Sequence, residues 1–245
     1  LIYILVVKIK KMINKIYIPI NNKFSSVFKF IFFLRYLIAI FFVAIVLFLS
    51  IPQFFDYKKK ERIIVNYLFE NYKIEVKKIE NIQYKSFPTP HLFLSNLATN
   101  FHKESINLKI GKMKIYPKLF SIFNYENFQV KKIKLINNNA NVNINEIVPL
   151  TKYLLNIKKK ISFENLSLKI KDKSRPVLLF EEINFTNYGY KKNKINGLVF
   201  NKKLIVNFEN ELNRFNLNIP DVGISLSINT FRNNDSKLAG NLKGK

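Results

Sequence analysis

Few residues of this chain have the types and spacing that catalysis or metal binding requires. The two histidines, His91 and His102, lie eleven positions apart in a region of turns and alternating residues, so they lack the helical spacing of paired metal ligands. Glu181 and Glu182 are adjacent, and adjacent residues of a strand point to opposite faces of a sheet. They therefore do not form the carboxylate pair of acid–base catalysis.

Other signatures of chemistry are also missing from the sequence. The chain contains no cysteine, which excludes disulfides and thiolate chemistry. Its six glycines form neither a dinucleotide-binding fingerprint nor a phosphate loop, and no serine lies in a nucleophile elbow. We expect a protein that is not an enzyme and that holds no metal or cofactor.

The charge of the chain is strongly positive. A formal net charge of +25, from 41 Lys and Arg against 16 Asp and Glu, raises nucleic acid and anionic lipid as partners. Lysine, asparagine, isoleucine and phenylalanine are abundant together, and their codons are rich in A and T, so genomic base composition accounts for much of this charge. The aromatic residues occupy the apolar positions of the predicted strands and are not interleaved with the lysines on one face. We therefore expect no nucleic-acid partner. Attraction to an anionic membrane surface follows from the charge itself.

One stretch near the start is almost entirely apolar. From Phe30 to Ile51 it is interrupted only by Arg35, and its length is close to the ~20 residues that a helix needs to cross ~30 Å of hydrocarbon. A signal peptide would have a shorter apolar core, and a buried soluble helix would keep some polar residues, so both alternatives fit less well. We predict a transmembrane anchor over residues 30–55, preceded by a basic arm over 1–29. The expected membrane contacts are Tyr36, Leu37, Ile38, Phe41, Phe42, Val43, Ile45, Val46, Leu47, Phe48, Leu49 and Ile51.

The charges beside this stretch do not decide its orientation. The basic residues on the N-terminal side are Lys23, Lys29 and Arg35, and those on the other side are Lys58, Lys59, Lys60 and Arg62. A long domain is translocated despite its charge, so an arrangement with the N-terminus inside and the body outside stays open. The chain begins with leucine, which is compatible with a fragment of a longer protein or with a start at Met12.

The residues after the anchor show two different periods. Apolar residues recur at three and four positions over 56–72, which predicts an amphipathic helix. From residue 73 to residue 245 the period is two, which predicts β-strands with lysine and asparagine on the opposite face. Gly111 falls where the apolar phase changes and indicates a bulge. Asn137–Asn139 indicate a turn.

Two short helices are expected to interrupt the strands, over Pro117–Phe123 and Glu146–Leu155. Later strands are predicted at Ile161–Lys171 and Val177–Phe185 and, after a turn at Tyr188–Tyr190, around Leu198, Ile205, Phe215 and Ile224. The pattern thus predicts about a dozen strands, each with one apolar face. The predicted helices are too few to cover these faces. Alternation by itself favours a sandwich or barrel core, and the other possibility is an open, curved sheet whose apolar lining holds a ligand.

The order of these features resembles the N-terminal region of the AsmA family. An apolar helix and an amphipathic helix precede the segment KSFPTPHLFLSNL at Lys85–Leu97, and KMKIYPKLF at Lys112–Phe120 follows. The strand FQVKKIKL at Phe128–Leu135 resembles the next element of that family. The resemblance covers roughly residues 30–144 and extends more loosely to the remainder.

The resemblance implies a mainly β fold, in which an N-terminal transmembrane helix carries an elongated, curved, antiparallel sheet shaped as a groove, with a few short helices. It also implies a single-pass inner-membrane protein with a cytoplasmic N-terminus and a periplasmic body over residues 73–245, which takes part in phospholipid transfer and outer-membrane assembly. Members of the family are usually much longer. Strands lie ~4.8 Å apart, so a dozen reach roughly 60 Å at most, which suits a short anchored relay or one piece of a longer protein.

If lipid occupies the sheet, its acyl chains would contact the apolar phase of the strands. The expected lipid-contacting residues are Ile106, Leu108, Ile110, Val130, Ile133, Leu135, Val142, Ile144, Phe163, Leu166, Leu168 and Ile170. The same residues could equally form an ordinary core. A membrane-anchored periplasmic scaffold that docks envelope proteins without moving lipid is the alternative function.

Overall fold

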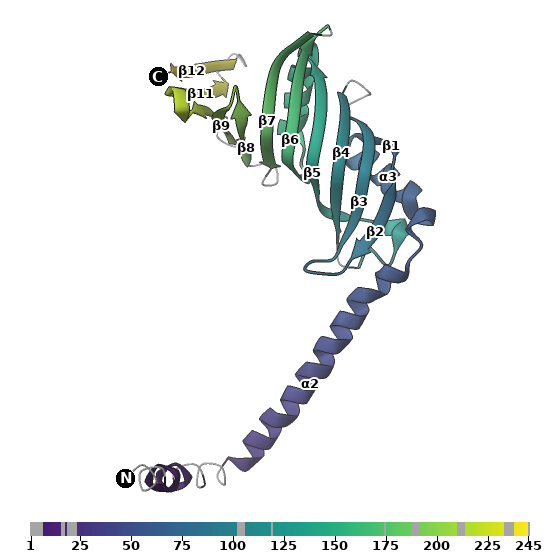
Figure 1. The fold of residues 1–245 in the computed structure, drawn as a ribbon, viewed down its shortest axis with the longest axis vertical. Helices are drawn as coiled ribbons and strands as arrows, with labels where there is room; N and C mark the ends of the chain where they lie inside the picture. Colours follow the sequence, from purple (N-terminus) through teal and green to yellow (C-terminus); the bar gives the residue numbers. More distant parts are fainter. Residues whose placement is uncertain are drawn as a thin grey trace. The chain divides into compact units, whose positions relative to one another are not determined.

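The computed structural model describes residues 7–15, 18, 24–101, 106–118, 120–173, 175–187, 192–209, 214–232 and 238–244. The chain divides into two compact units, Leu1–Ile51 and Pro52–Lys245. We call the second unit the β body (Figure 1). His102 and the predicted turn at Tyr188–Tyr190 lie outside the described residues.

The first unit contains the long apolar helix α2, Ser25–Ser50. It begins five residues before the predicted anchor, and its 26 residues correspond to about 39 Å at 1.5 Å per residue. Together with η1, Ile51–Phe54, it forms a stretch long and apolar enough to cross a membrane. None of its side chains is buried within the unit, and residues 7–15 ahead of it are also helical. A helix that exposes apolar side chains all round is typical of a membrane span.

The predicted amphipathic helix is confirmed as α3, Tyr57–Tyr72. Asp56 caps its first turn by accepting a hydrogen bond from the backbone N–H of Lys58 at 3.1 Å, and Lys73 ends it in the left-handed conformation. Ile64, Leu68 and Tyr72 form a fully buried stripe at four-residue spacing. This stripe is the face that α3 presents to the sheet.

The sheet is a single, long array of twelve strands among the described residues. Its order is β1-β3-β4-β5-β6-β7-β8-β9-β10-β11-β12, and β2 also pairs with β3. The bounds are β1 Ile74–Lys78, β2 Asn81–Lys85, β3 His91–Phe101, β4 Ile106–Pro117, β5 Val130–Asn143, β6 Lys160–Asp172, β7 Arg175–Asn187, β8 Lys192–Val199, β9 Lys202–Glu209, β10 Arg214–Ile219, β11 Ile224–Arg232 and β12 Leu238–Gly244. The mainly β fold with an open sheet is confirmed, and the sandwich that alternation alone favoured is wrong.

One part of the expected topology needs correction. The sheet is mixed and not entirely antiparallel, because β5 and β6 run parallel. A parallel pair needs a crossover, and here the connection contains η3, Ile144–Glu146, and α4, Ile147–Asn156. The helix predicted at Glu146–Leu155 is therefore confirmed, and it has a topological role that the sequence pattern did not reveal.

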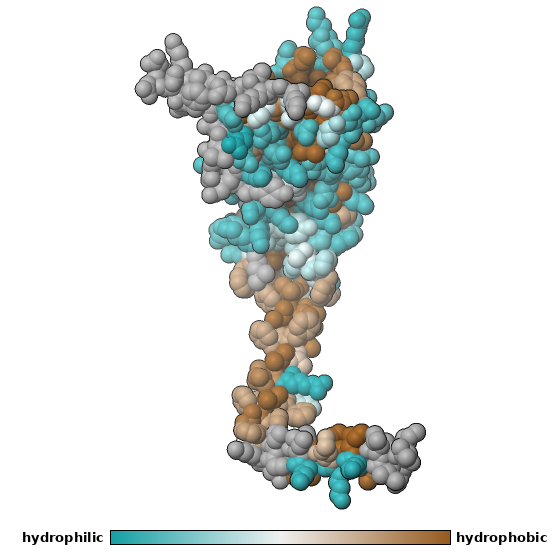
Figure 2. Space-filling model, turned by 90° about the vertical axis from the view of Figure 1, so that its left-hand side faces the viewer, coloured by the Kyte–Doolittle hydropathy of each residue, from teal (hydrophilic) through white to brown (hydrophobic). Residues whose placement is uncertain are grey.

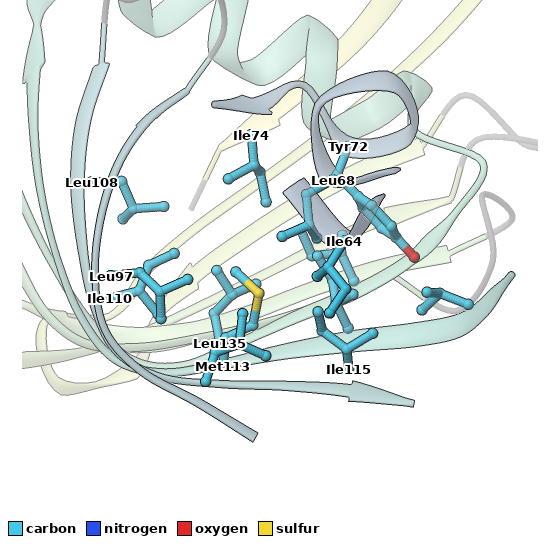
Figure 3. Close-up of a cluster of buried hydrophobic side chains, with 14 of the residues drawn as sticks. Ile64, Leu68, Tyr72, Ile74, Leu97, Leu108, Ile110, Met113, Ile115 and Leu135 are labelled. Atoms are coloured by element: carbon cyan, nitrogen blue, oxygen red, sulfur yellow. The ribbon is translucent and has the colours of Figure 1, made fainter. Parts of the chain in front are cut away.

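The main core lies between α3 and the first strands of the sheet. Ile64, Leu68 and Tyr72 lie in one buried cluster with apolar side chains of β3, β4 and β5 (Figure 3). The fully buried members of these strands include Leu92, Leu94, Leu97, Ile110, Met113, Ile115, Ile133 and Leu135. The first third of the sheet is thus a conventional two-layer packing of helix on sheet.

A row of unusual backbone conformations crosses the middle of the sheet. Asn96, Asn137, Asn165 and Glu182 have φ values of 50°, 55°, 51° and 51°, and they lie in β3, β5, β6 and β7, respectively. In β4, Gly111 falls opposite both Asn96 and Asn137, between the paired residues on either side. From β3 to β6 the pairing keeps one register through this row.

The row explains the change of apolar phase that the sequence shows. In β4 the buried residues are Ile106, Leu108 and Ile110 before the row and Met113 and Ile115 after it. Because neighbouring strands change phase at the same level, one face of the sheet stays apolar over the full strand length. Gly111 does mark the phase change, as predicted, but without the register shift of a bulge.

Two predicted local structures are wrong. Asn137–Asn139 form no turn, because β5 continues through them and the left-handed Asn137 belongs to the row. The described part of Pro117–Phe123 is not an α-helix: β4 extends to Pro117, and the backbone N–H of Lys118 donates to the carbonyl oxygen of Gln129 at 2.9 Å. Turns at Ser121 and Phe123 and the short η2, Tyr125–Asn127, then lead to β5. The four weaker strands predicted after residue 190 are confirmed as β8 to β11.

The row makes a prediction about Gly111. A Cβ atom there would lie 2.9 Å from the backbone oxygen of Asn137, so Gly111→Ala forces two paired strands apart. We expect the free energy of unfolding to fall by roughly 1–3 kcal/mol in chemical denaturation. Lys109→Ala, on the exposed face of the same strand, is the matched control and should change it by less than about 0.5 kcal/mol. Equal stability of both variants would contradict the steric argument.

Candidate functional site

The helices of the β body cover only part of the apolar face of the sheet. Among the described residues, α3 lies over the first strands and α4 over the region of β5 and β6, and no α-helix follows over the later strands. An open groove of about 450 Å³ lies there, which is within the size range of small-molecule pockets. Figure 2 shows hydrophobic side chains gathered within the β body and bordered by hydrophilic ones.

Strand alternation builds the walls of this groove. In β10, Phe215, Leu217 and Ile219 face the groove, whereas Asn216 and Asn218 point to the other side. The described lining residues are Ile106, Leu108, Ala140, Val142, Leu150, Leu154, Phe163, Leu166, Leu168, Phe180, Ile183, Phe185, Ile195, Val199, Leu204, Val206, Phe208, Phe215, Leu217 and Ile219. All of them are apolar.

This lining limits the chemistry of the groove. Among the described residues it presents no charge and no side-chain hydrogen-bond donor, so it has nothing with which to transfer a proton, bind a metal ion or stabilise a developing charge. Aromatic rings contribute part of the surface: Phe208 and Phe215 lie 4.7 Å apart between centroids, and Phe163 and Phe185 lie 6.0 Å apart. Such a surface suits alkyl chains, which gain from leaving water and need no directional partner.

Helix α4 forms one end of the groove. Its Leu150 and Leu154 belong to the lining, and its Tyr153 hydroxyl donates to the backbone oxygen of Tyr72 at 2.5 Å. Burial raises the pKa of both tyrosines, with a smaller contribution from a neighbouring tyrosine in each case, so the Tyr153 hydroxyl remains a protonated donor. This contact ties α4 to the end of α3.

Asn187 fixes the chain where α4 ends. It is buried in β7, and its Oδ1 atom accepts a hydrogen bond from the backbone N–H of Ile161 at 2.7 Å. Its Nδ2 group donates to the backbone oxygens of Ile157 at 3.2 Å and Lys159 at 2.8 Å. One side chain therefore joins β7 to both the exit from α4 and the start of β6.

Asn193, opposite Asn187 in β8, is a second buried amide. It lies on the same face of β8 as Ile195 and pairs across strands with Phe208, and both of these residues line the groove. Neither its Nδ2 nor its Oδ1 atom has a hydrogen-bond partner. A buried amide in this state is a place where a ligand oxygen or a water molecule gains a hydrogen bond.

The predicted lipid-contacting residues separate into two groups. Six line the groove, namely Ile106, Leu108, Val142, Phe163, Leu166 and Leu168, and the first four of them are also buried members of the main core cluster. Ile110, Val130, Ile133 and Leu135 lie in the core that α3 covers. Ile170 is buried in β6, and Ile144 is 45% exposed in η3 and not in the strand predicted for it. Lipid contact itself stays a prediction for all twelve.

Sequence reasoning missed the larger part of the groove. The missed lining residues are Ala140, Leu150, Leu154, Phe180, Ile183, Phe185, Ile195, Val199, Leu204, Val206, Phe208, Phe215, Leu217 and Ile219. The sequence contained a signal for them, because apolar residues continue to alternate with polar ones in the strands after β6. What the pattern did not show is that α3 covers the earlier strands and leaves the later ones open.

The candidates for chemistry are not brought together. The Nδ1 atom of His91 lies 2.7 Å from the backbone oxygen of Thr89, its ring stacks on Tyr116 at 5.4 Å, and burial lowers the pKa of His91. Glu181 and Glu182 lie in β7, away from His91 in β3. Within the described part of the chain, no three residues of the metal-binding types gather into a site.

Comparisons of this chain with protein-family models, with curated proteins and with solved structures found no match. The groove therefore has to be interpreted from its own geometry.

The role of Asn187 makes a prediction. In Asn187→Ala the buried N–H of Ile161 loses its acceptor, so we expect the free energy of unfolding to fall by about 1–3 kcal/mol in chemical denaturation. Asn218→Ala, on the exposed face of β10, serves as the control and should leave it within about 0.5 kcal/mol. A loss of equal size in both variants would mean that Asn187 does not hold this junction.

Proposed function

We propose that this protein is a membrane-anchored, AsmA-like carrier that accepts the acyl chains of phospholipids in its groove and takes part in moving them through the cell envelope. The observation that carries the proposal is an open groove lined by apolar residues alone in a chain that also contains a helix able to cross a membrane. The function is non-enzymatic, with no cofactor.

The energetics of lipid transfer require such a surface. Each methylene that leaves an apolar environment for water costs ~0.8 kcal/mol, so a two-chain lipid does not leave a bilayer without a comparably apolar path. The groove supplies this environment to the chains while the headgroup stays in water. A lining without fixed charges gives little selection among headgroups, and Asn193 is the nearby amide that could bond an ester or headgroup oxygen.

The proposed location follows the AsmA resemblance. The apolar helix lies in the inner membrane with its N-terminus in the cytoplasm, and the β body lies in the periplasm. The groove spans β4 to β10 and not the whole sheet, because α3 covers the apolar face of the first strands. With strands ~4.8 Å apart this path is short, which supports a relay more than a full bridge between membranes.

The proposal predicts that a charge in the groove prevents lipid binding. In Leu217→Asp a carboxylate enters the apolar lining, whereas in Asn218→Asp the same charge lies on the opposite face of β10. We expect the first variant to lose phospholipid and the second to keep it, as measured by lipid extraction and mass spectrometry of the full chain purified in detergent. Lipids around the apolar helix are common to both variants, so the difference reports the groove.

A second variant covers the case in which Leu217→Asp fails to fold. Leu168→Trp keeps the lining apolar but fills part of its volume, and it should also lower the bound phospholipid. Far-UV circular dichroism checks that each variant retains its strands. Equal phospholipid in wild type and in well-folded groove variants would contradict transport. A protein segment retained in the groove in place of lipid would favour the scaffold.

A further inference from the structure

One end of the β body exposes phenylalanine side chains. Phe54 in η1 is 87% exposed, Phe87 between β2 and β3 is 62% exposed, and Phe120 after β4 is 70% exposed. Large apolar side chains gathered at one place on a surface usually mark a site of interaction with a partner or a membrane.

Contacts within the β body bring these three segments together. The Nε2 group of Gln53 donates to the Oγ atom of Ser86 at 2.6 Å, which joins the segment of Phe54 to that of Phe87. The ring of Phe55 packs edge-on against Phe123 at 6.1 Å. The backbone N–H of Phe123 in turn donates to the oxygen of Phe120 at 3.2 Å. The three exposed rings therefore come from segments that meet at one end of the strands.

The same end is strongly basic. Residues 52–60, 85–91 and 114–132 contain eight lysines and only two acidic residues, Asp56 and Glu126. Lys60 lies over the ring of Phe55 at 5.6 Å, and Lys132 lies over Tyr116 at 4.5 Å. We call the surface formed by Phe54, Phe87 and Phe120 and by the lysines of these segments the basal face.

We propose that the basal face docks onto the surface of an anionic phospholipid bilayer, with the three phenylalanine rings inserted at the interface and the lysines against the headgroups. Aromatic rings beside basic residues are the combination that binds membrane interfaces, and each lysine near an anionic surface adds attraction. The apolar helix leads directly into Pro52, the first residue of the β body. The basal face is therefore covalently next to the segment proposed to enter the membrane. The proposal rests on the anchoring part of the proposed function and adds a second membrane contact.

The absence of tryptophan from the sequence makes the test direct. Phe87→Trp and Phe120→Trp carry the test, and Phe54→Trp is the positive control, because Phe54 belongs to the stretch able to cross a membrane. Each is introduced into the full chain, which is then reconstituted in nanodiscs of phosphatidylcholine with or without phosphatidylglycerol. Phe200→Trp is the matched control, because Phe200 is 75% exposed between β8 and β9, at the opposite end of the strands. Tryptophan emission and its quenching by brominated acyl chains are measured in each disc.

If the basal face is docked, the three basal variants emit at shorter wavelength than Phe200→Trp, and brominated lipid quenches them while the control is unaffected. Quenching is stronger with phosphatidylglycerol and weakens at high salt, because the lysine contribution is screened. Emission and quenching of Phe87→Trp and Phe120→Trp equal to those of Phe200→Trp would overturn the proposal. Emission at shorter wavelength without quenching would also overturn it, because a protein partner or a second copy would then cover the rings.

Failure of the basal-face proposal can be distinguished from failure of the proposed function. A chain that does not stay in the nanodisc would refute the anchor, and unchanged lipid content in the groove variants would refute transport. Neither result depends on where the basal phenylalanines lie.

Discussion

The structure depends on one constraint, namely that the strands from β3 to β10 have an apolar face that must leave water. In the first third of the sheet, α3 meets this requirement, and Ile64, Leu68 and Tyr72 are fully buried against it. Over the later strands no described helix does so, and the open groove is the result. An apolar surface left open in this way is costly in water unless something else occupies it.

The row of left-handed residues makes this one-sided sheet possible at its full strand length. Strands β3 and β5 have eleven and fourteen residues, and the alternation of their buried side chains changes phase at this row. Asparagine tolerates positive φ better than other residues with a side chain, and Gly111 accepts the close approach of Asn137. Since the change occurs at one level in neighbouring strands, the pairing from β3 to β6 keeps its register.

The proposed functions share a physical basis. A groove without polar lining residues favours acyl chains for the same reason that a helix apolar on all sides favours the interior of a bilayer. The basic charge is compatible with both, because it lies on the opposite face of the strands and at the basal face and does not enter the groove. A single compositional trend, many lysines beside many isoleucines and phenylalanines, thus suits a protein that works next to lipid.

The sequence alone determined the elements that local patterns specify. The apolar helix, the helix over 57–72 and most strands follow from hydrophobic periodicity, which depends only on residues close in the chain. It did not determine the parallel pairing of β5 with β6, the continuation of β5 through Asn137, or the division of the apolar phase into core and groove. Ile133 and Val206 both face the apolar side of the sheet, yet Ile133 lies in the core that α3 covers, whereas Val206 belongs to a separate small cluster and lines the groove. Only the tertiary structure decided between them, because the difference lies in which distant segment packs above each residue.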